Sequence, residues 1–176
     1  MKIFKILVIV TLIFNSGLIY AQSTKDKKIM KDAVKAKKTI LEQVPDLEEF
    51  FEDSAGYVIF PNVGKGGFII GGASGNGILY ENKVAVGAAN LKKLNIGLQA
   101  GGQAIIEVIF FETEKDLKDF KDGDFEFEAG ASAVALKSGV SINAKYKDGV
   151  AVFALPKAGL MADASVGGQK FGYKPF

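Results

Sequence analysis

The sequence predicts an α+β fold, in which an N-terminal helix pair precedes a mostly antiparallel, Gly-rich β-barrel or two-layer sandwich with one short inserted helix. Two observations lead to this fold class. Before residue 45, apolar residues recur at steps of three and four, which is the helical period. From Gly56 onward, short apolar runs of strand length are separated by Gly, Asn, Asp and Lys.

The segment 1–21 has the three parts of a cleavable secretory signal peptide. Lys2 and Lys5 precede an apolar run, 6–20, which ends at Ala21 before a polar stretch. A membrane anchor is the alternative, but a run of about 15 residues is shorter than the roughly 20 that a spanning helix needs. The sequence therefore predicts an exported protein that is periplasmic or envelope-associated, or secreted.

Removal of this segment takes the formal net charge from +2 to zero, because it carries two Lys and no acid. A neutral chain has no overall attraction to nucleic acid, so no nucleic-acid partner is expected. The chain contains no Cys and no His. Ser-His-Asp and Cys-His catalysis and the usual Zn, Cu and haem sites are thereby excluded. Carboxylate chemistry, Lys chemistry and oxygen-only metal binding remain, but none has a clear sequence signature, and we expect no enzyme, no cofactor and no metal.

The helical pattern covers 24–44, and a second short helix is expected to begin at Pro45. The apolar face of the first helix comprises Ile29, Met30, Ala33, Val34, Ile40, Leu41 and Val44. In the second helix the side chains expected to face the core are Leu47, Phe50 and Phe51. The segment 22–54 would thus be helical and form one globular unit with a β-rich part, 55–176.

About 9–10 strands are expected after the helices. They are 57–60, 67–72, 77–80, 84–90, 94–101, 104–111, 125–136, 140–146, 150–155 and 160–171. Asn82-Lys83 and Lys147-Asp148-Gly149 are turn signals, and Asn62 and Gly75-Asn76-Gly77 are expected to interrupt strands. Glycines inside strands indicate bends or close approach of neighbouring backbones.

One short helix is expected within the β-rich part, over 113–121. Thr113 would cap its N-terminus, and Leu117 and Phe120 would point inward.

Two further patterns suggest chemistry but have simpler explanations. The acidic cluster Asp122, Asp124, Glu126 and Glu128 could be a Ca²⁺ site, but Phe and Glu alternate at 125–128, as on a half-exposed strand. The run Gly64-Lys65-Gly66-Gly67 lacks the spacing of a phosphate-binding loop and precedes a strand.

The first helix carries a basic face. The segment 25–38 holds seven Lys and two Asp, a local charge of +5. On spacing alone, a solvated helix face that covers the sheet is favoured. The alternative is an amphipathic basic helix at an anionic lipid surface. Because the chain has no Arg, any phosphate contact would use Lys or backbone N–H groups.

Several blocks after residue 55 resemble the bacterial SYLF domain, a lipid-binding module. The blocks are Gly56-Tyr57-Val58-Ile59-Phe60-Pro61-Asn62-Val63 with Lys65, Gly67 and Phe68, then Gly71-Gly72 with Gly75, Gly77 and Leu79, then Gly97-Leu98-Gln99-Ala100-Gly101-Gly102-Gln103, 108–111, Ala129-Gly130-Ala131 and Ala158-Gly159-Leu160-Met161-Ala162. The resemblance implies a non-enzymatic lipid-binding domain of the cell envelope whose partner is phospholipid or an anionic membrane surface.

On this hypothesis the basic helix contacts anionic phospholipid. The expected phosphate contacts are Lys27, Lys28, Lys31, Lys35 and Lys38, with Lys65 as a further candidate. A structural or protein-interaction module of the periplasm or outer envelope is the alternative. An enzyme would need a carboxylate pair in a deep cleft, for example one that includes Glu107 or Glu112. The lipid headgroup, any protein partner and the oligomeric state are left open by the sequence.

Overall fold

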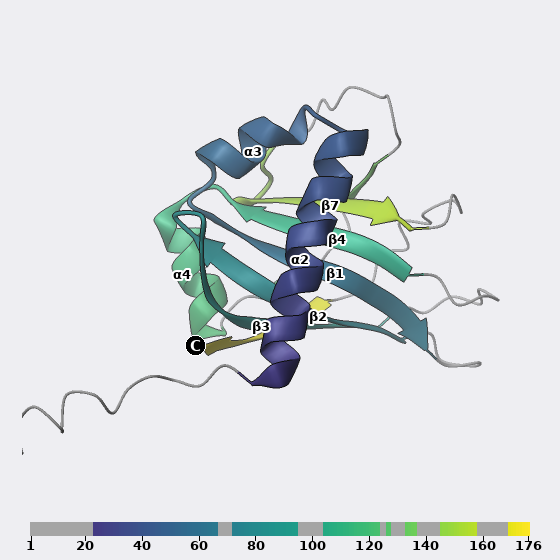
Figure 1. Ribbon diagram of the computed structural model, residues 1–176. Helices are drawn as coiled ribbons and strands as arrows, with labels where there is room; N and C mark the ends of the chain where they lie inside the picture. Colours follow the sequence, from purple (N-terminus) through teal and green to yellow (C-terminus); the bar gives the residue numbers. More distant parts are fainter. Residues whose placement is uncertain are drawn as a thin grey trace, which may run out of the picture.

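A computed structural model describes residues 23–66, 72–94, 104–123, 126–127, 133–136, 145–157 and 169–176. Within these residues the elements follow one another as α2 (Thr24–Gln43), α3 (Leu47–Asp53), β1 (Gly56–Gly66), β2 (Gly72–Glu81), β3 (Val84–Leu94), β4 (Ala104–Phe111), α4 (Glu114–Asp122), β5 (Glu126–Phe127), β6 (Ala133–Ala135), β7 (Val150–Pro156) and β8 (Gln169–Pro175). The α+β class is confirmed (Figure 1). The predicted signal peptide lies outside the described residues.

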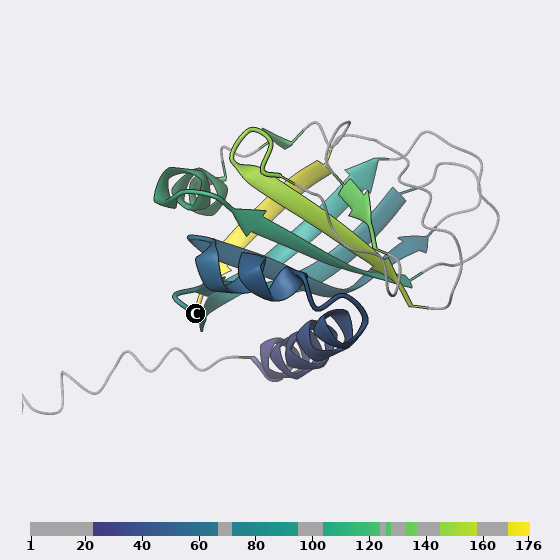
Figure 2. The ribbon, with the colours of Figure 1, turned by 90° about the horizontal axis from the view of Figure 1, so that it is seen from above.

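The described strands form one sheet in the order β5-β8-β3-β2-β1-β4-β7-β6. All pairings are antiparallel except that of β6 with β7. Figure 2 shows β7 crossing the direction of β8 and β3 steeply, so the sheet is strongly twisted and curved. Because β5 and β6 lie at opposite edges, the sheet is open over the described residues, and the closed barrel is not found there.

The sheet separates two apolar clusters. One face carries Tyr57, Ile59 and Phe110 and packs against α2 and α3. The other face carries Phe60 and Phe111 and packs against α4; its α4 residues are Leu117 and Phe120. Alternation along β1 and β4 sends successive side chains to opposite clusters, because neighbouring residues of a strand point to opposite faces. The core therefore lies on both sides of β1 and β4, which are interior strands of the sheet.

The three predicted helices are present, although α3 begins at Leu47 rather than at Pro45. In α2, Ser23 and Asp26 cap each other's backbone N–H groups, and in α4 Thr113 and Asp116 do the same. Leu47 and Phe51 of α3 are fully buried, and Phe50 is half-buried. No helix in the described ranges is long and apolar enough to cross a membrane.

Two residues of α2 contradict the predicted faces. Val34 was expected in the core but is 61% exposed. Lys37 was placed among the solvated lysines, whereas its Nζ lies 4.2 Å from the ring centroid of Phe51 and 5.4 Å from that of Tyr57. The ammonium group is attracted to the negative faces of these rings, and its aliphatic stem covers apolar surface.

The strand interruptions predicted at two positions are wrong, whereas the predicted turns are confirmed. Gly75-Asn76-Gly77 lies within β2, and Asn62 lies within β1, where the register with both neighbouring strands shifts around Pro61. Asn82 and Lys83 have φ values of 49° and 65°, as in a two-residue hairpin turn. The predicted strands at 67–72, 94–101, 140–146 and 160–171 fall largely outside the described residues.

Tyr57 provides a test of this packing at alkaline pH. Burial, followed by the charges of Tyr80, Glu52 and Glu48, raises the pKa of Tyr57 to about 12 from its ordinary 10.0. A raised folded-state pKa contributes stability that is fully present below pH about 10 and is lost as the pH rises towards about 12. In an ultraviolet titration of phenolate, Tyr57→Phe should lower the amplitude of the late step without abolishing it, because burial also raises the pKa of Tyr146 to about 12. Identical late steps in both proteins would contradict this packing.

Candidate functional site

Five of the six predicted phosphate contacts lie together on one exposed face of α2. Figure 1 shows α2 running across the face of the sheet, so its outer side meets solvent along its length. The five residues, which we call the lysine face, are Lys27, Lys28, Lys31, Lys35 and Lys38, and each is exposed. Their spacing of one, three and four residues places them on neighbouring turns. Lys65 lies in β1 opposite Ala73, and its side chain is outside the described part.

Ion pairs divide the lysine face into two groups. Lys28 Nζ lies 2.9 Å from Asp32 Oδ2, and Lys38 Nζ lies 3.7 Å from Glu42 Oε1. Within the described part of the chain, Lys27, Lys31 and Lys35 form no ion pair. These three ammonium groups are therefore the ones with the least competition for an anion, although exposed pairs such as the first two contribute little to stability.

An apolar margin borders the lysine face. Val34 is 61% exposed, and Met30 and Leu41 are half-buried. Val34 lies three residues after Lys31 and four before Lys38, so its methyl groups emerge beside their side chains. The apolar pattern of 24–44 had assigned Val34 to the core instead. The helical spacing from the lysines was the signal that could have placed it.

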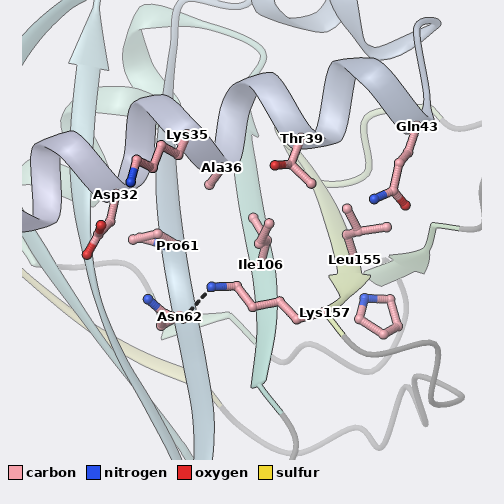
Figure 3. Close-up of a pocket in the computed structure, with 11 residues that line it drawn as sticks. Asp32, Lys35, Ala36, Thr39, Gln43, Pro61, Asn62, Ile106, Leu155 and Lys157 are labelled. Carbon is pink, nitrogen blue, oxygen red and sulfur yellow. Dashed lines mark hydrogen bonds between the residues drawn. The ribbon is translucent and has the colours of Figure 1, made fainter.

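A groove lies on the other side of the lysine face, between α2 and the sheet (Figure 3). We call it the α2 groove, and its volume is about 310 Å³. It is lined by Asp32, Lys35, Ala36, Thr39, Gln43, Pro61, Asn62, Ile106, Leu155, Pro156 and Lys157. Two features leave this space open. Ala36 and Thr39 have short side chains, and β1, which forms part of the floor, departs from regular strand pairing around Pro61.

Positive charge from two distant segments meets in the α2 groove. Lys35 comes from α2, and Lys157 follows β7. The Lys157 N–H donates to the carbonyl of Ala104 at 3.1 Å, and its Nζ donates to Asn62 Oδ1. In Figure 3 the Lys157 side chain lies along the floor with its ammonium group towards Asn62. Lys157 was not among the predicted contacts, because no local sequence pattern links it to α2.

The pKa of Asp32 shows that these lysines lie close to the same carboxylate. The hydrogen bond from Lys28 lowers the pKa of Asp32, burial opposes this, and the charges of Lys28, Lys35 and Lys157 lower it further. Ammonium groups from α2 and from the end of β7 thus act on the same carboxylate. The groove and the lysine face form one continuous basic region that shares Lys35.

Glu107 and Glu112 do not lie together. Glu107 is fully buried on β4, opposite Phe60 and Ala154. Glu112 is exposed and lies in a separate acidic hollow lined by Pro45, Asp46, Glu49, Phe50, Asp53, Glu112, Lys145 and Tyr146. Glu112 follows Glu107 by five positions and comes directly after the end of β4, roughly 16 Å away at the strand rise. In the acidic cluster, Asp122 accepts a hydrogen bond from Lys118 at 2.6 Å; Asp124 and the side chains of Glu126 and Glu128 are outside the described part.

Comparison with known proteins finds one relative of named activity. No protein-family model matches the chain, so the SYLF resemblance stays a prediction. The chain is 26% identical to Beta cell expansion factor A of Aeromonas veronii over 134 residues, which are 75% of this chain and 51% of that protein. The chain therefore spans about half the length of this relative, to which it is similar across most of its own length.

Proposed function

We propose that this protein is a non-enzymatic lipid-binding domain of the cell envelope, which contacts an anionic phospholipid surface through the lysine face of α2. The observation that carries the proposal is the set of exposed lysines, three of them without an ion pair in the described chain, next to the exposed Val34. A basic face with an apolar margin is the arrangement found in helices that lie on membranes.

The energetics favour joint action of the lysines. A Lys near an anionic membrane contributes on the order of 1 kcal/mol. Lysines within one or two helical turns fall inside a Debye length of about 10 Å, so they experience the surface potential together. Val34 adds apolar burial if its methyl groups enter the interface. The proposal therefore requires binding that falls steeply as salt concentration rises.

Other features support the location and the fold of the proposed domain. The pattern of 1–21 predicts export, and the blocks after residue 55 resemble SYLF domains. Closure of the sheet into a barrel or a two-layer sandwich belongs to the same proposal, because it depends on segments outside the described residues. An exported protein would meet envelope phospholipid rather than cytosolic phosphoinositides.

Replacing Lys27 and Lys31 together with Gln should weaken binding to phosphatidylglycerol-containing vesicles by about 2 kcal/mol, or about 30-fold in Kd. The residues are exposed and without ion pairs in the described part, so the fold should be unaffected. Vesicle co-sedimentation at low and moderate salt measures the change. Lys92→Gln with Lys174→Gln removes the same charge from the exposed sides of β3 and β8 and serves as the control.

Two results would contradict the proposal. Equal binding of the wild-type protein to anionic and neutral vesicles would remove the role of charge. Unchanged binding of the Lys27→Gln, Lys31→Gln variant would show that the protein contacts vesicles through another surface.

A structural or protein-interaction module is the second candidate. The ion pairs of Lys28 and Lys38 with acids one turn later favour it, because they are typical of a solvated helix face. It predicts no lipid dependence and a protein partner that cross-linking recovers.

The similarity to Beta cell expansion factor A adds a third candidate, action on beta cells by an exported protein. Counting dividing beta cells in culture with and without the purified protein tests it directly. The Lys27→Gln, Lys31→Gln variant then shows whether any such effect depends on the lysine face.

A further inference from the structure

We propose that the α2 groove binds the phosphate group of a phosphate ester between Lys35 and Lys157. Where the ester is a phospholipid, this inference deepens the proposed function and rests on it. Where the ester is soluble, the inference stands on the groove alone.

Donors line the groove along its length, because Lys35 and Gln43 are eight residues apart on α2, about 12 Å at the helical rise. Lys35 approaches from α2, and Lys157 approaches along the floor from the end of β7 (Figure 3). Thr39 and Gln43 extend from α2 towards the strands and supply a hydroxyl and an amide group. Asn62 uses its Oδ1 to accept from Lys157, which leaves its amide nitrogen as a donor.

This arrangement suits phosphate better than carboxylate. A phosphate monoester presents three non-ester oxygens in a tetrahedral arrangement, and donors on several sides can each reach one. A carboxylate is planar with two oxygens, so it would leave part of the donor set unused. The chain has no Arg for two-pronged recognition, and lysines act as point charges that need no fixed plane.

The acid in the groove does not cancel this charge. Asp32 is already hydrogen-bonded to Lys28 at 2.9 Å. Together, Lys28, Lys35 and Lys157 against Asp32 leave a local charge of +2. A phosphate ester of comparable negative charge would therefore neutralise this local charge. Its oxygens would accept from Lys157 in place of water and of Asn62 Oδ1.

Size and apolar lining define the rest of the ligand. The volume of about 310 Å³ is at the lower end of the roughly 300–1,000 Å³ of small-molecule sites. It suits one headgroup-sized ester rather than a whole lipid. Pro61, Ile106 and Leu155 form an apolar side, against which the carbon atoms next to the phosphate would pack.

The test uses two probes on the purified protein. sn-Glycerol 3-phosphate is titrated by NMR, with acetate as the carboxylate control, and vesicles of phosphatidic acid in phosphatidylcholine are co-sedimented. Lys157→Gln should weaken binding of at least one probe about tenfold, since it removes a charged hydrogen-bond donor. Thr39→Val should weaken the same probe, and Lys174→Gln should leave both unchanged. Circular dichroism confirms that each variant is folded.

The outcomes separate the two sources of phosphate. Loss with glycerol 3-phosphate alone identifies a soluble ester, and loss with vesicles alone identifies a lipid headgroup; both support the groove. The inference would be overturned if Lys157→Gln bound both probes with wild-type affinity. It would also be overturned if acetate shifted the NMR signals of the protein as much as sn-glycerol 3-phosphate does. The Lys27→Gln, Lys31→Gln variant should retain glycerol 3-phosphate binding, so failure of the lysine-face proposal remains distinguishable from failure of this one.

Discussion

Replacing Phe110 with Ala is expected to lower the free energy of unfolding by about 3–5 kcal/mol. Phe110 is fully buried on β4, and its ring centroid lies 4.8 Å from that of Phe51 and 5.4 Å from that of Phe50. Phe153 and Tyr57 follow at 5.7 and 5.9 Å. The ring thus joins α3 to the sheet, and its removal leaves a cavity that rigid neighbouring strands cannot close.

Urea denaturation followed by circular dichroism measures this loss. Val84→Ala is a suitable control, because Val84 is 63% exposed and its truncation should change the free energy by less than about 0.5 kcal/mol. The loss in free energy of unfolding for Phe110→Leu should lie between the losses for Phe110→Ala and Val84→Ala. A loss below about 1 kcal/mol for Phe110→Ala would show that the aromatic cluster is not packed as described.

Replacing Gly77 with Ala is expected to cost about 3 kcal/mol, an unusually large effect for one methyl group. A Cβ atom at Gly77 would lie 2.6 Å from the carbonyl oxygen of Ile59 and 2.7 Å from the ring of Phe60. The carbonyl belongs to the paired backbone of β1, so it cannot move without disturbing the centre of the sheet. The free energy of unfolding should fall accordingly in thermal or urea denaturation.

Gly64→Ala is the matched control, since the same substitution on β1 meets no atom within 4 Å. Its free energy of unfolding should stay constant or rise by about 0.5 kcal/mol, because Ala restricts the unfolded chain more than Gly. Equal losses at Gly64 and Gly77 would mean that strand propensity, rather than close approach of β1 and β2, determines the effect.

The sequence predicted those elements that depend on local patterns. The helical spacing of 24–44 and the cap at Thr113 were sufficient because hydrogen bonds and side-chain caps in helices join residues that are close in the sequence. The bounds of β4 followed from its apolar run. In contrast, Gly75-Asn76-Gly77 resembles a turn, but close packing of β1 keeps these residues in a strand. That packing comes from tertiary structure, which local patterns do not report.

The candidate site likewise has one part that local sequence patterns predict and one part that they do not. The lysine face lies on one helix, so residue spacing alone brought its members together. The α2 groove needs Asn62 and Lys157, which are 95 residues apart in the sequence. Val34 was assigned to the buried face of α2 and Lys37 to its exposed face, and both assignments were wrong. Helical periodicity defines the two faces, but it does not say which residues at their borders the sheet and α3 cover.

The pairing of β3 with β8 has a consequence for the order in which the chain becomes stable. Tyr173 donates its hydroxyl hydrogen bond to Val86, 87 residues earlier in the sequence. During synthesis, one edge of β3 therefore stays unpaired until β8 is available. Closing so long a loop is slow. An unpaired edge invites association with other chains. Until β8 pairs with it, β3 is therefore open to such association.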